Sequence, residues 1–171
     1  MKNLKYLVLA GVFLLSGCSD QDRLWEERAA PVLGSTDEVR TENNHLLDGV
    51  YWAEIAPVSG SERIVFRVLR VHYGEECHRW ALEMGFEDAC MNDYEVETYP
   101  EAYVELGDGA VITVARPDGP EGNLLIDRAT LQRLVFSGSV NGPQGYEWVP
   151  FPFLLTVENG YATSAEQIWV P

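Results

Sequence analysis

From Asp48 onward, the pattern of apolar and polar positions is mainly that of β-strands. Val50–Ile55 predicts a first strand, and Ile64–Tyr73 predicts a longer one that is rich in β-branched residues. Both faces of the longer segment are largely apolar apart from two arginines. That pattern is typical of a central strand, covered by the core on one face and partly covered on the other.

Two glycine-containing turns predict hairpins nearer the C-terminus. Asn159-Gly160 is the strongest two-residue hairpin signal in the chain, and it separates Phe153–Glu158 from Tyr161–Val170. Alternate residues of the first of these segments are apolar, so they share one face of the predicted sheet.

A second hairpin is predicted around Gly107-Asp108-Gly109, because glycine and aspartate at adjacent positions favour turns. The apolar segments Tyr103–Leu106 and Val111–Ala115 would form its two strands.

Two short segments have helical periodicity instead. Glu75 and Glu76 suit a helix N-terminus, and Gly85 suits the end of the same helix. Its apolar positions follow at helical spacing, namely Cys77, Trp80, Ala81 and Met84. A second helix is predicted from Asp127, as the N-cap, to Gly138, with Leu131, Leu134 and Val135 facing inward.

These elements together predict an α+β fold: mainly an antiparallel curved β-sheet or partial barrel with two short helices. We expect a single domain over residues 48–171. Residues 18–47 are polar and contain several turn-forming residues, so they predict a tether in front of that domain.

The first residues carry the most specific motif. Lys2 and Lys5 precede the apolar stretch Leu7–Leu15, which is too short to span a bilayer, and Leu15-Ser16-Gly17-Cys18 closes it. The segment resembles a bacterial lipoprotein signal peptide over residues 1–17. The resemblance implies that Cys18 is diacylated and becomes the new N-terminus, which would hold the chain on a membrane of the cell envelope. The alternatives are an ordinary secretory signal and an N-terminal anchor helix.

Ser19 follows the cysteine, where an aspartate would resemble the retention signal for the inner membrane. In a bacterium with two membranes the outer membrane is therefore favoured.

A further resemblance covers residues 48–171. Asp48-Gly49-Val50-Tyr51, Asn92-Asp93-Tyr94 and the segment Phe151–Gly160 are similar to a group of uncharacterised secreted and lipoprotein domains of bacteria. The resemblance implies one intact extracytoplasmic domain and no particular activity.

Charge narrows the range of partners. Both lysines lie in the signal, so the mature chain would carry ten arginines against 27 acidic residues, a net charge of −17. Such a surface repels nucleic acid and anionic lipid headgroups. The expected partners are the membrane, through lipidated Cys18, and an unknown envelope protein or small ligand.

Cysteine usage predicts a disulfide. With Cys18 lipidated, Cys77 and Cys90 are left as a pair in an oxidising compartment. Cys77 lies on the apolar stripe of the first predicted helix, which favours a structural disulfide over the alternative of a reactive or metal-binding pair.

Candidate chemistry is sparse, and no residue is predicted to be catalytic and no cofactor is expected. No Gly-x-Ser-x-Gly elbow or phosphate-binding glycine loop occurs in the sequence. Of the three histidines, His72 and His78 are expected to approach each other. The acidic loop around Cys90 offers weak calcium candidates, Asp88, Asn92 and Asp93, although the ordered spacing of a calcium loop is missing. The alternative is that Asn92-Asp93-Tyr94 fixes a turn.

Aromatic residues give a weak binding signal. Tyr146, Trp148 and Phe151 cluster beside prolines in a predicted loop, as residues at partner interfaces often do. The alternative is a loop that folds its rings onto the core.

The sequence leads to two functional hypotheses. The first is a membrane-anchored binding or accessory module of the cell envelope. The second is an envelope hydrolase that uses acidic residues, with calcium as a further option. A deep pocket that gathers carboxylates and a histidine would favour the enzyme, and an open surface with exposed aromatic residues would favour the binding module.

Overall fold

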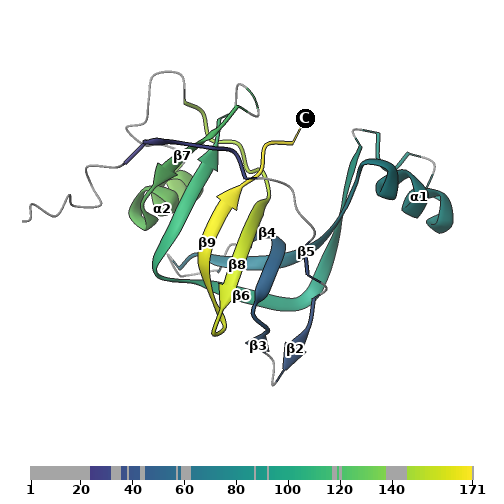
Figure 1. The fold of residues 1–171 in the computed structure, drawn as a ribbon, viewed down its shortest axis with the longest axis horizontal. Helices are drawn as coiled ribbons and strands as arrows, with labels where there is room; N and C mark the ends of the chain where they lie inside the picture. Colours follow the sequence, from purple (N-terminus) through teal and green to yellow (C-terminus); the bar gives the residue numbers. More distant parts are fainter. Residues whose placement is uncertain are drawn as a thin grey trace, which may run out of the picture.

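Strands dominate the fold and curve around a common core (Figure 1). The computed structural model describes residues 24–31, 36–37, 39–42, 45–56, 58, 63–86, 88–91, 93–116, 119, 121–137 and 146–170. In chain order its elements are β1 (Glu27–Arg28), β2 (Thr41–Glu42), β3 (His45–Leu46), β4 (Gly49–Ala56), β5 (Val65–Tyr73), α1 (Gly74–Met84), β6 (Tyr94–Ala115), β7 (Asn123–Ile126), α2 (Arg128–Ser137), β8 (Phe153–Glu158) and β9 (Tyr161–Gln167).

Five of the strands pair in a closed ring. The main sheet has the order β1-β7-β6-β5-β4-β8-β9, and β9 also pairs with β6. Every pair in the ring is antiparallel except β6 with β9, so the sheet is mixed. The predicted α+β fold, with a curved sheet or partial barrel and two short helices, is confirmed within the described residues.

The order of pairing around this ring is informative. Around the ring, β4 pairs with β5, β5 with β6, β6 with β9, β9 with β8, and β8 with β4. Helix α2 lies between the ring strands β6 and β8 in sequence. The sheet is therefore strongly curved, and the parallel β6–β9 pairing closes the ring.

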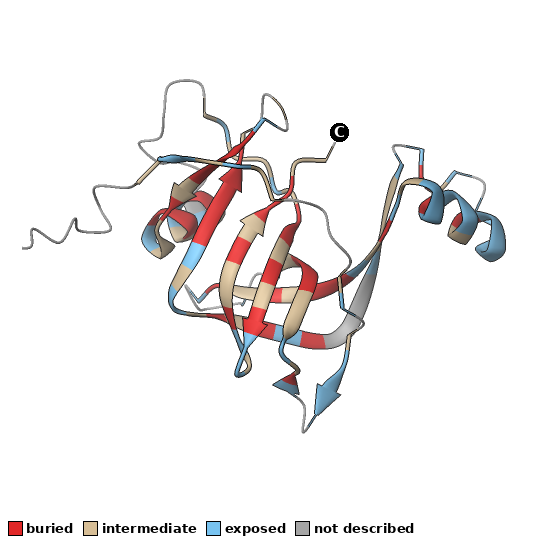
Figure 2. Ribbon diagram, in the orientation of Figure 1, coloured by how far each residue is buried: buried red, intermediate tan, exposed pale blue. Residues whose placement is uncertain are grey.

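The core fills the inside of the ring. Phe66 and Val68 on β5 and Leu155 on β8 are completely buried, and buried positions alternate along β8 as the sequence predicted (Figure 2). Helix α2 adds Leu131 and Leu134 to the same core. Burying a side chain of this size contributes about 1.5–3 kcal/mol to stability.

The predicted β8–β9 hairpin is confirmed. Asn159 and Gly160 have φ values of 53° and 80°, the left-handed conformation that a two-residue turn of this kind requires. Alternate residues of β8 face the core as expected.

The second predicted hairpin is wrong, because Gly107-Asp108-Gly109 lies inside one 22-residue strand, β6. The pairing of β6 with β9 shifts register between Leu106 and Val111, and Gly109 has a φ of 73°. A Cβ atom on Gly107 would lie 3.1 Å from the carbonyl oxygen of Ala162. The glycines therefore allow a bulge at which one strand bends around the barrel, and they do not reverse the chain.

The second helix begins as predicted. The Thr130 amide donates a hydrogen bond to Asp127 Oδ1 at 2.7 Å, so Asp127 is the N-cap.

The segment expected to be a tether contacts the domain at several of its described residues. The Trp25 amide donates to the Leu125 carbonyl at 2.6 Å, β1 pairs with β7, and Leu46 on β3 is buried. The apolar side chains of Leu24, Trp25 and Leu46 explain this, because the barrel core offers them a surface to cover. Cys18 and the predicted signal peptide lie outside the described residues. None of the described helices has the length and apolar character needed to cross a membrane.

Candidate functional site

Helix α1 sits at the tip of an extension of the β5–β6 ladder. Cross-strand pairs continue from Leu69 opposite Thr98 to Tyr73 opposite Tyr94, and α1 follows directly. Figure 1 shows α1 at the end of this ladder, away from α2 and from the closed ring. We call α1 and residues 85–93, which return from it to β6, the head.

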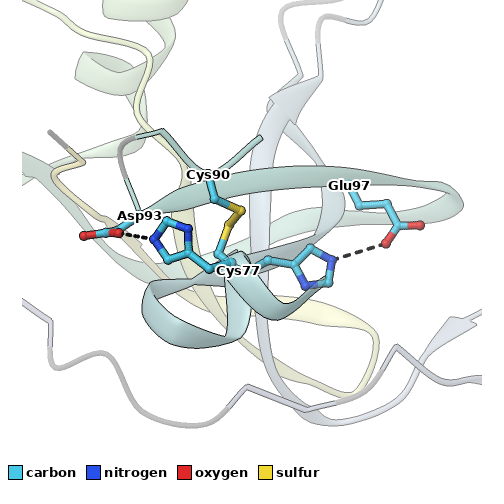
Figure 3. Close-up of a disulfide and its surroundings, with 6 residues drawn as sticks. Cys77, Cys90, Asp93 and Glu97 are labelled. Atoms are coloured by element: carbon cyan, nitrogen blue, oxygen red, sulfur yellow. Dashed lines mark hydrogen bonds and ion pairs between the residues drawn. A yellow bond between two sulfur atoms is a disulfide. The ribbon is translucent and has the colours of Figure 1, made fainter. Parts of the chain in front are cut away.

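A disulfide holds the head together. Cys77 on α1 and Cys90 on the returning segment are bonded, with their Cα atoms 5.7 Å apart and both side chains buried (Figure 3). Around them the described part of the head buries little else except Ala81, with Trp80 and Ala89 packed against it. The predicted disulfide and the buried position of Cys77 on its helix are both confirmed.

The predicted limits of α1 are confirmed as well. Glu75 and Glu76 occupy its first turn, and Gly85 ends it in the left-handed conformation with a φ of 74°. At the base of the head, the Gly74 amide donates to the Asp93 carbonyl at 2.8 Å, which closes the insertion.

The two histidines of this region have separate acidic partners. His78 Nε2 lies 2.6 Å from Asp93 Oδ1, whereas His72 Nε2 lies 3.5 Å from Glu97 Oε2. Figure 3 shows the two carboxylates on opposite sides of the disulfide. Each histidine therefore lies beside its own carboxylate.

The His72 ring is buried, at 6% exposed, and stacks on Trp80 with 4.2 Å between ring centroids and 12° between planes. At 3.5 Å its Nε2 atom is too distant from Glu97 for a good hydrogen bond, and it has no hydrogen-bond partner among the described residues.

An open groove runs between α1 and the start of β6. Its volume is about 860 Å³, and it combines aromatic, thioether and carboxylate side chains. The residues that matter for its chemistry are Trp80, Met84, Phe86, Asp88, Glu95 and Glu97.

The head also exposes large apolar side chains. Leu82 and Met91 are 84% and 82% exposed, and Met84 and Phe86 are about half exposed. Several large apolar side chains exposed on one small segment are typical of an interaction site.

Tyr94 lies at the root of the head. Its ring contacts Trp52 of β4 edge-on at 6.3 Å, and its hydroxyl is buried without a hydrogen-bond partner among the described residues. Burial raises the pKa of the Tyr94 phenol, and the nearby carboxylates of Glu54 and Glu95 raise it further.

The weak calcium candidates do not gather into a metal site. Asp88 is exposed, Asp93 is paired with His78, and Asn92 lies outside the described residues. Nowhere in the described part of the chain do three or more histidine, cysteine, aspartate or glutamate side chains come close enough to hold a metal ion. The Asp93 amide donates to the Cys90 carbonyl at 3.0 Å, so the backbone turns here, whereas the Asp93 side chain is paired with His78.

The aromatic segment near residue 150 is folded onto the barrel. Tyr146 and Trp148 are partly buried against the main core, and Tyr146 contacts Trp25 with 5.0 Å between ring centroids. Phe151 contacts Trp169 edge-on at 6.4 Å. Burial raises the pKa of the Tyr146 phenol. These contacts favour the alternative interpretation of this segment, in which the rings cover the core.

A second, smaller cavity of about 320 Å³ lies beside β6 and β7. Arg128 lines this cavity, and its guanidinium group donates to the backbone carbonyls of Leu106 and Gly107. This cavity is therefore a weaker candidate than the groove, because Arg128 supports the bend in β6.

Compared with known proteins, the chain matches no family model, no curated protein and no solved structure at a significant level. The site therefore has to be interpreted from its own geometry.

Sequence analysis did not predict the groove. Trp80 was assigned to the buried stripe of α1, and Glu95 and Glu97 are separated from it by the whole returning segment. One signal was available. Leu82 and Phe86 lie between the two cysteines and Met91 follows the second, and so short a segment cannot bury all three side chains.

Proposed function

We propose that the chain is a lipid-anchored extracytoplasmic binding module in which the head recognises the ligand. The observation that carries the proposal is the surface of the head. Four of the ten large apolar side chains exposed among the described residues lie there, namely Leu82, Met84, Phe86 and Met91, and two of them, Met84 and Phe86, line the groove. Exposing such residues contributes nothing to folding, so a binding role explains them best.

The barrel serves as the scaffold in this proposal. Its core is continuous and its strands form a ring, so the β5–β6 ladder presents the head on a rigid base. Fold alone does not define function. A net charge of −15 for the whole chain makes nucleic acid an unsuitable ligand.

One observation favours the alternative, an envelope hydrolase. The groove gathers Asp88, Glu95 and Glu97, and His72 lies beside Glu97. However, the groove is open to solvent, and the His72 imidazole is buried behind Trp80, where it cannot reach a substrate. An open aromatic surface suits binding better than acid–base catalysis.

Photo-cross-linking in envelope membranes tests the role of the head. A benzophenone amino acid at position 86 is compared with one at position 136, because Phe86 and Phe136 are similarly exposed, at 50% and 45%, on different elements. We expect a discrete product from position 86 that excess soluble domain competes away, and no such product from position 136. Equal products from both positions, or none from position 86, would contradict the proposal.

The anchor is tested separately. Cys18→Ala should release the domain into the soluble fraction or leave an uncleaved precursor, because no cysteine remains to be acylated at the signal. Mass spectrometry that finds a mature N-terminus elsewhere and no acyl mass would contradict lipidation.

A further inference from the structure

The rim of the groove carries unpaired negative charge. Asp88 and Glu95 form no ion pair with any described residue, and Glu97 is approached by Arg70 at 3.4 Å and by His72 at 3.5 Å. The carboxylates of Asp88 and Glu95 are therefore available to a ligand of opposite charge.

The walls of the groove are aromatic and apolar. Trp80 and Phe86 meet with 5.5 Å between ring centroids and a tilt of 58°, so the two rings form a corner. The half-exposed Met84 lies on the same groove. Aromatic faces attract cations, and thioethers pack against aliphatic groups.

His72 fixes the position of the larger ring. Its imidazole stacks on Trp80 and is more than nine-tenths buried, and its Nε2 atom points toward Glu97, one of the groove carboxylates, without a hydrogen-bond partner among the described residues. Trp80 is thus packed between His72 and Phe86, and the corner is preorganised before any ligand arrives.

We propose that this groove binds an organic cation, an ammonium or guanidinium group carried on an apolar stem. The inference rests on the proposed function and specifies its ligand class. Asp88 and Glu95 attract the charge, the Trp80 and Phe86 rings contact the cation, and Met84 covers the stem. An anion would be repelled, and a neutral apolar ligand would leave the two carboxylates unused.

Two sources could supply this chemistry: a lysine or arginine side chain of an envelope protein, or a small quaternary ammonium compound. The probes are choline and the peptide acetyl-Leu-Arg-Leu-Arg-amide. Their matched controls are 3,3-dimethylbutan-1-ol, a neutral isostere of choline, and acetyl-Leu-Gln-Leu-Gln-amide. Each is titrated by calorimetry into the full-length disulfide-bonded protein in a non-ionic detergent.

We expect at least one cationic probe to bind at least tenfold more tightly than its neutral control, with an affinity that falls as salt rises. Preference for choline would identify a small ligand, and preference for the peptide would identify a side chain. Glu95→Gln should weaken binding about fivefold to tenfold, whereas Glu158→Gln, the same charge change on an exposed residue of β8, should leave it within twofold.

Phe86→Leu provides a second variant, because it keeps an apolar side chain at a half-exposed position and removes the ring. It should weaken the cation severalfold and leave the neutral isostere unchanged, with Phe136→Leu as its control.

Two results would overturn the inference. If the neutral probes bind as tightly as the cations, the groove is an apolar site without charge recognition. If no probe binds while position 86 still cross-links in membranes, the head recognises another class of ligand. In both cases the proposed function survives, whereas failure of the cross-linking itself would remove it.

Discussion

The closed ring of strands and the head differ in what holds each of them together. The ring surrounds a continuous core in which Phe66, Leu155 and many neighbours are fully buried. The head buries two half-cystines and Ala81, and a covalent bond replaces the core that it lacks. A small segment that is held by a disulfide, and yet exposes Leu82 and Met91, is not arranged for its own stability.

The two regions also differ in where their apolar side chains and charges lie. In the ring, most large apolar side chains are buried and the surface carries ion pairs such as Arg67 with Glu54, although Tyr103, Val111 and Tyr161 are about half exposed. In the head, apolar side chains point outward beside unpaired carboxylates. We therefore regard the ring as the scaffold and the head as the recognition element.

Replacing phenylalanine by alanine should change the free energy of unfolding far more in the ring than in the head. Phe66→Ala removes a fully buried ring that packs edge-on against Phe153 at 5.3 Å, so we expect a loss of about 3–5 kcal/mol in the free energy of unfolding. Phe86→Ala, at a half-exposed position of the head, should change it by less than about 0.5 kcal/mol. Denaturant unfolding measures both, and similar losses would show that the head is part of the core.

Loss of the disulfide should disorder the head alone. The bond joins residues 13 apart in sequence, and a loop of that length corresponds to about 3 kcal/mol of stabilisation. In the double variant Cys77→Ala and Cys90→Ala, amide hydrogen exchange should rise across residues 74–91 and stay unchanged in β8 and β9. Faster exchange throughout the barrel would mean that the two regions unfold together.

The N-cap of α2 offers a smaller and local effect on the barrel side. Asp127→Ala removes the acceptor of the Thr130 amide and should cost about 1 kcal/mol. Asp127→Asn keeps an acceptor at the same position and should recover most of that loss. Thermal unfolding of the two variants decides the point, and equal stability of both with the wild type would remove Asp127 as a cap.

The smallest expected effect concerns Tyr94, which joins the ladder to the head. Burial raises the pKa of its phenol in the folded chain, so the unfolded chain loses its proton first as pH rises above about 10. Stability is then unaffected by this group below pH 10 and falls above it, by less than about 1.4 kcal/mol per pH unit because the ring is only partly buried.

Tyr94→Phe should reduce that alkaline loss, measured as the free energy of unfolding between pH 9 and 11. At neutral pH the same variant should stay within about 1 kcal/mol of the wild type, because the hydroxyl has no hydrogen-bond partner among the described residues. An unchanged alkaline slope in the variant would assign the effect to other groups.

Local signals in the sequence predicted most of the barrel. Apolar, β-branched-rich runs located β4 and β5, apolar alternation located β8, Asn159-Gly160 located the last turn, and Asp127 and Gly85 located helix ends. Each of these depends on interactions between near neighbours in the chain, which a short sequence window contains.

The features that the sequence did not predict correctly depend on contacts between residues far apart in the chain. Gly107-Asp108-Gly109 follows a local turn rule, but the long-range pairings of β6 with β5, β7 and β9 override it and turn the glycines into a bulge. The groove is also long-range, because it needs Trp80 of α1 beside Glu95 of β6. A short sequence window contains neither contact.

Removal of the head tests whether the ring alone provides the stability of the domain. Tyr73 and Tyr94 are directly paired across β5 and β6, so a two-residue Asn-Gly turn can replace residues 74–93 and close the ladder as a hairpin. If the head serves recognition and the ring serves stability, the free energy of unfolding of this variant should lie within about 1 kcal/mol of the wild type. A variant that fails to fold, or that loses several kcal/mol, would contradict the account and make the head a structural part of the domain.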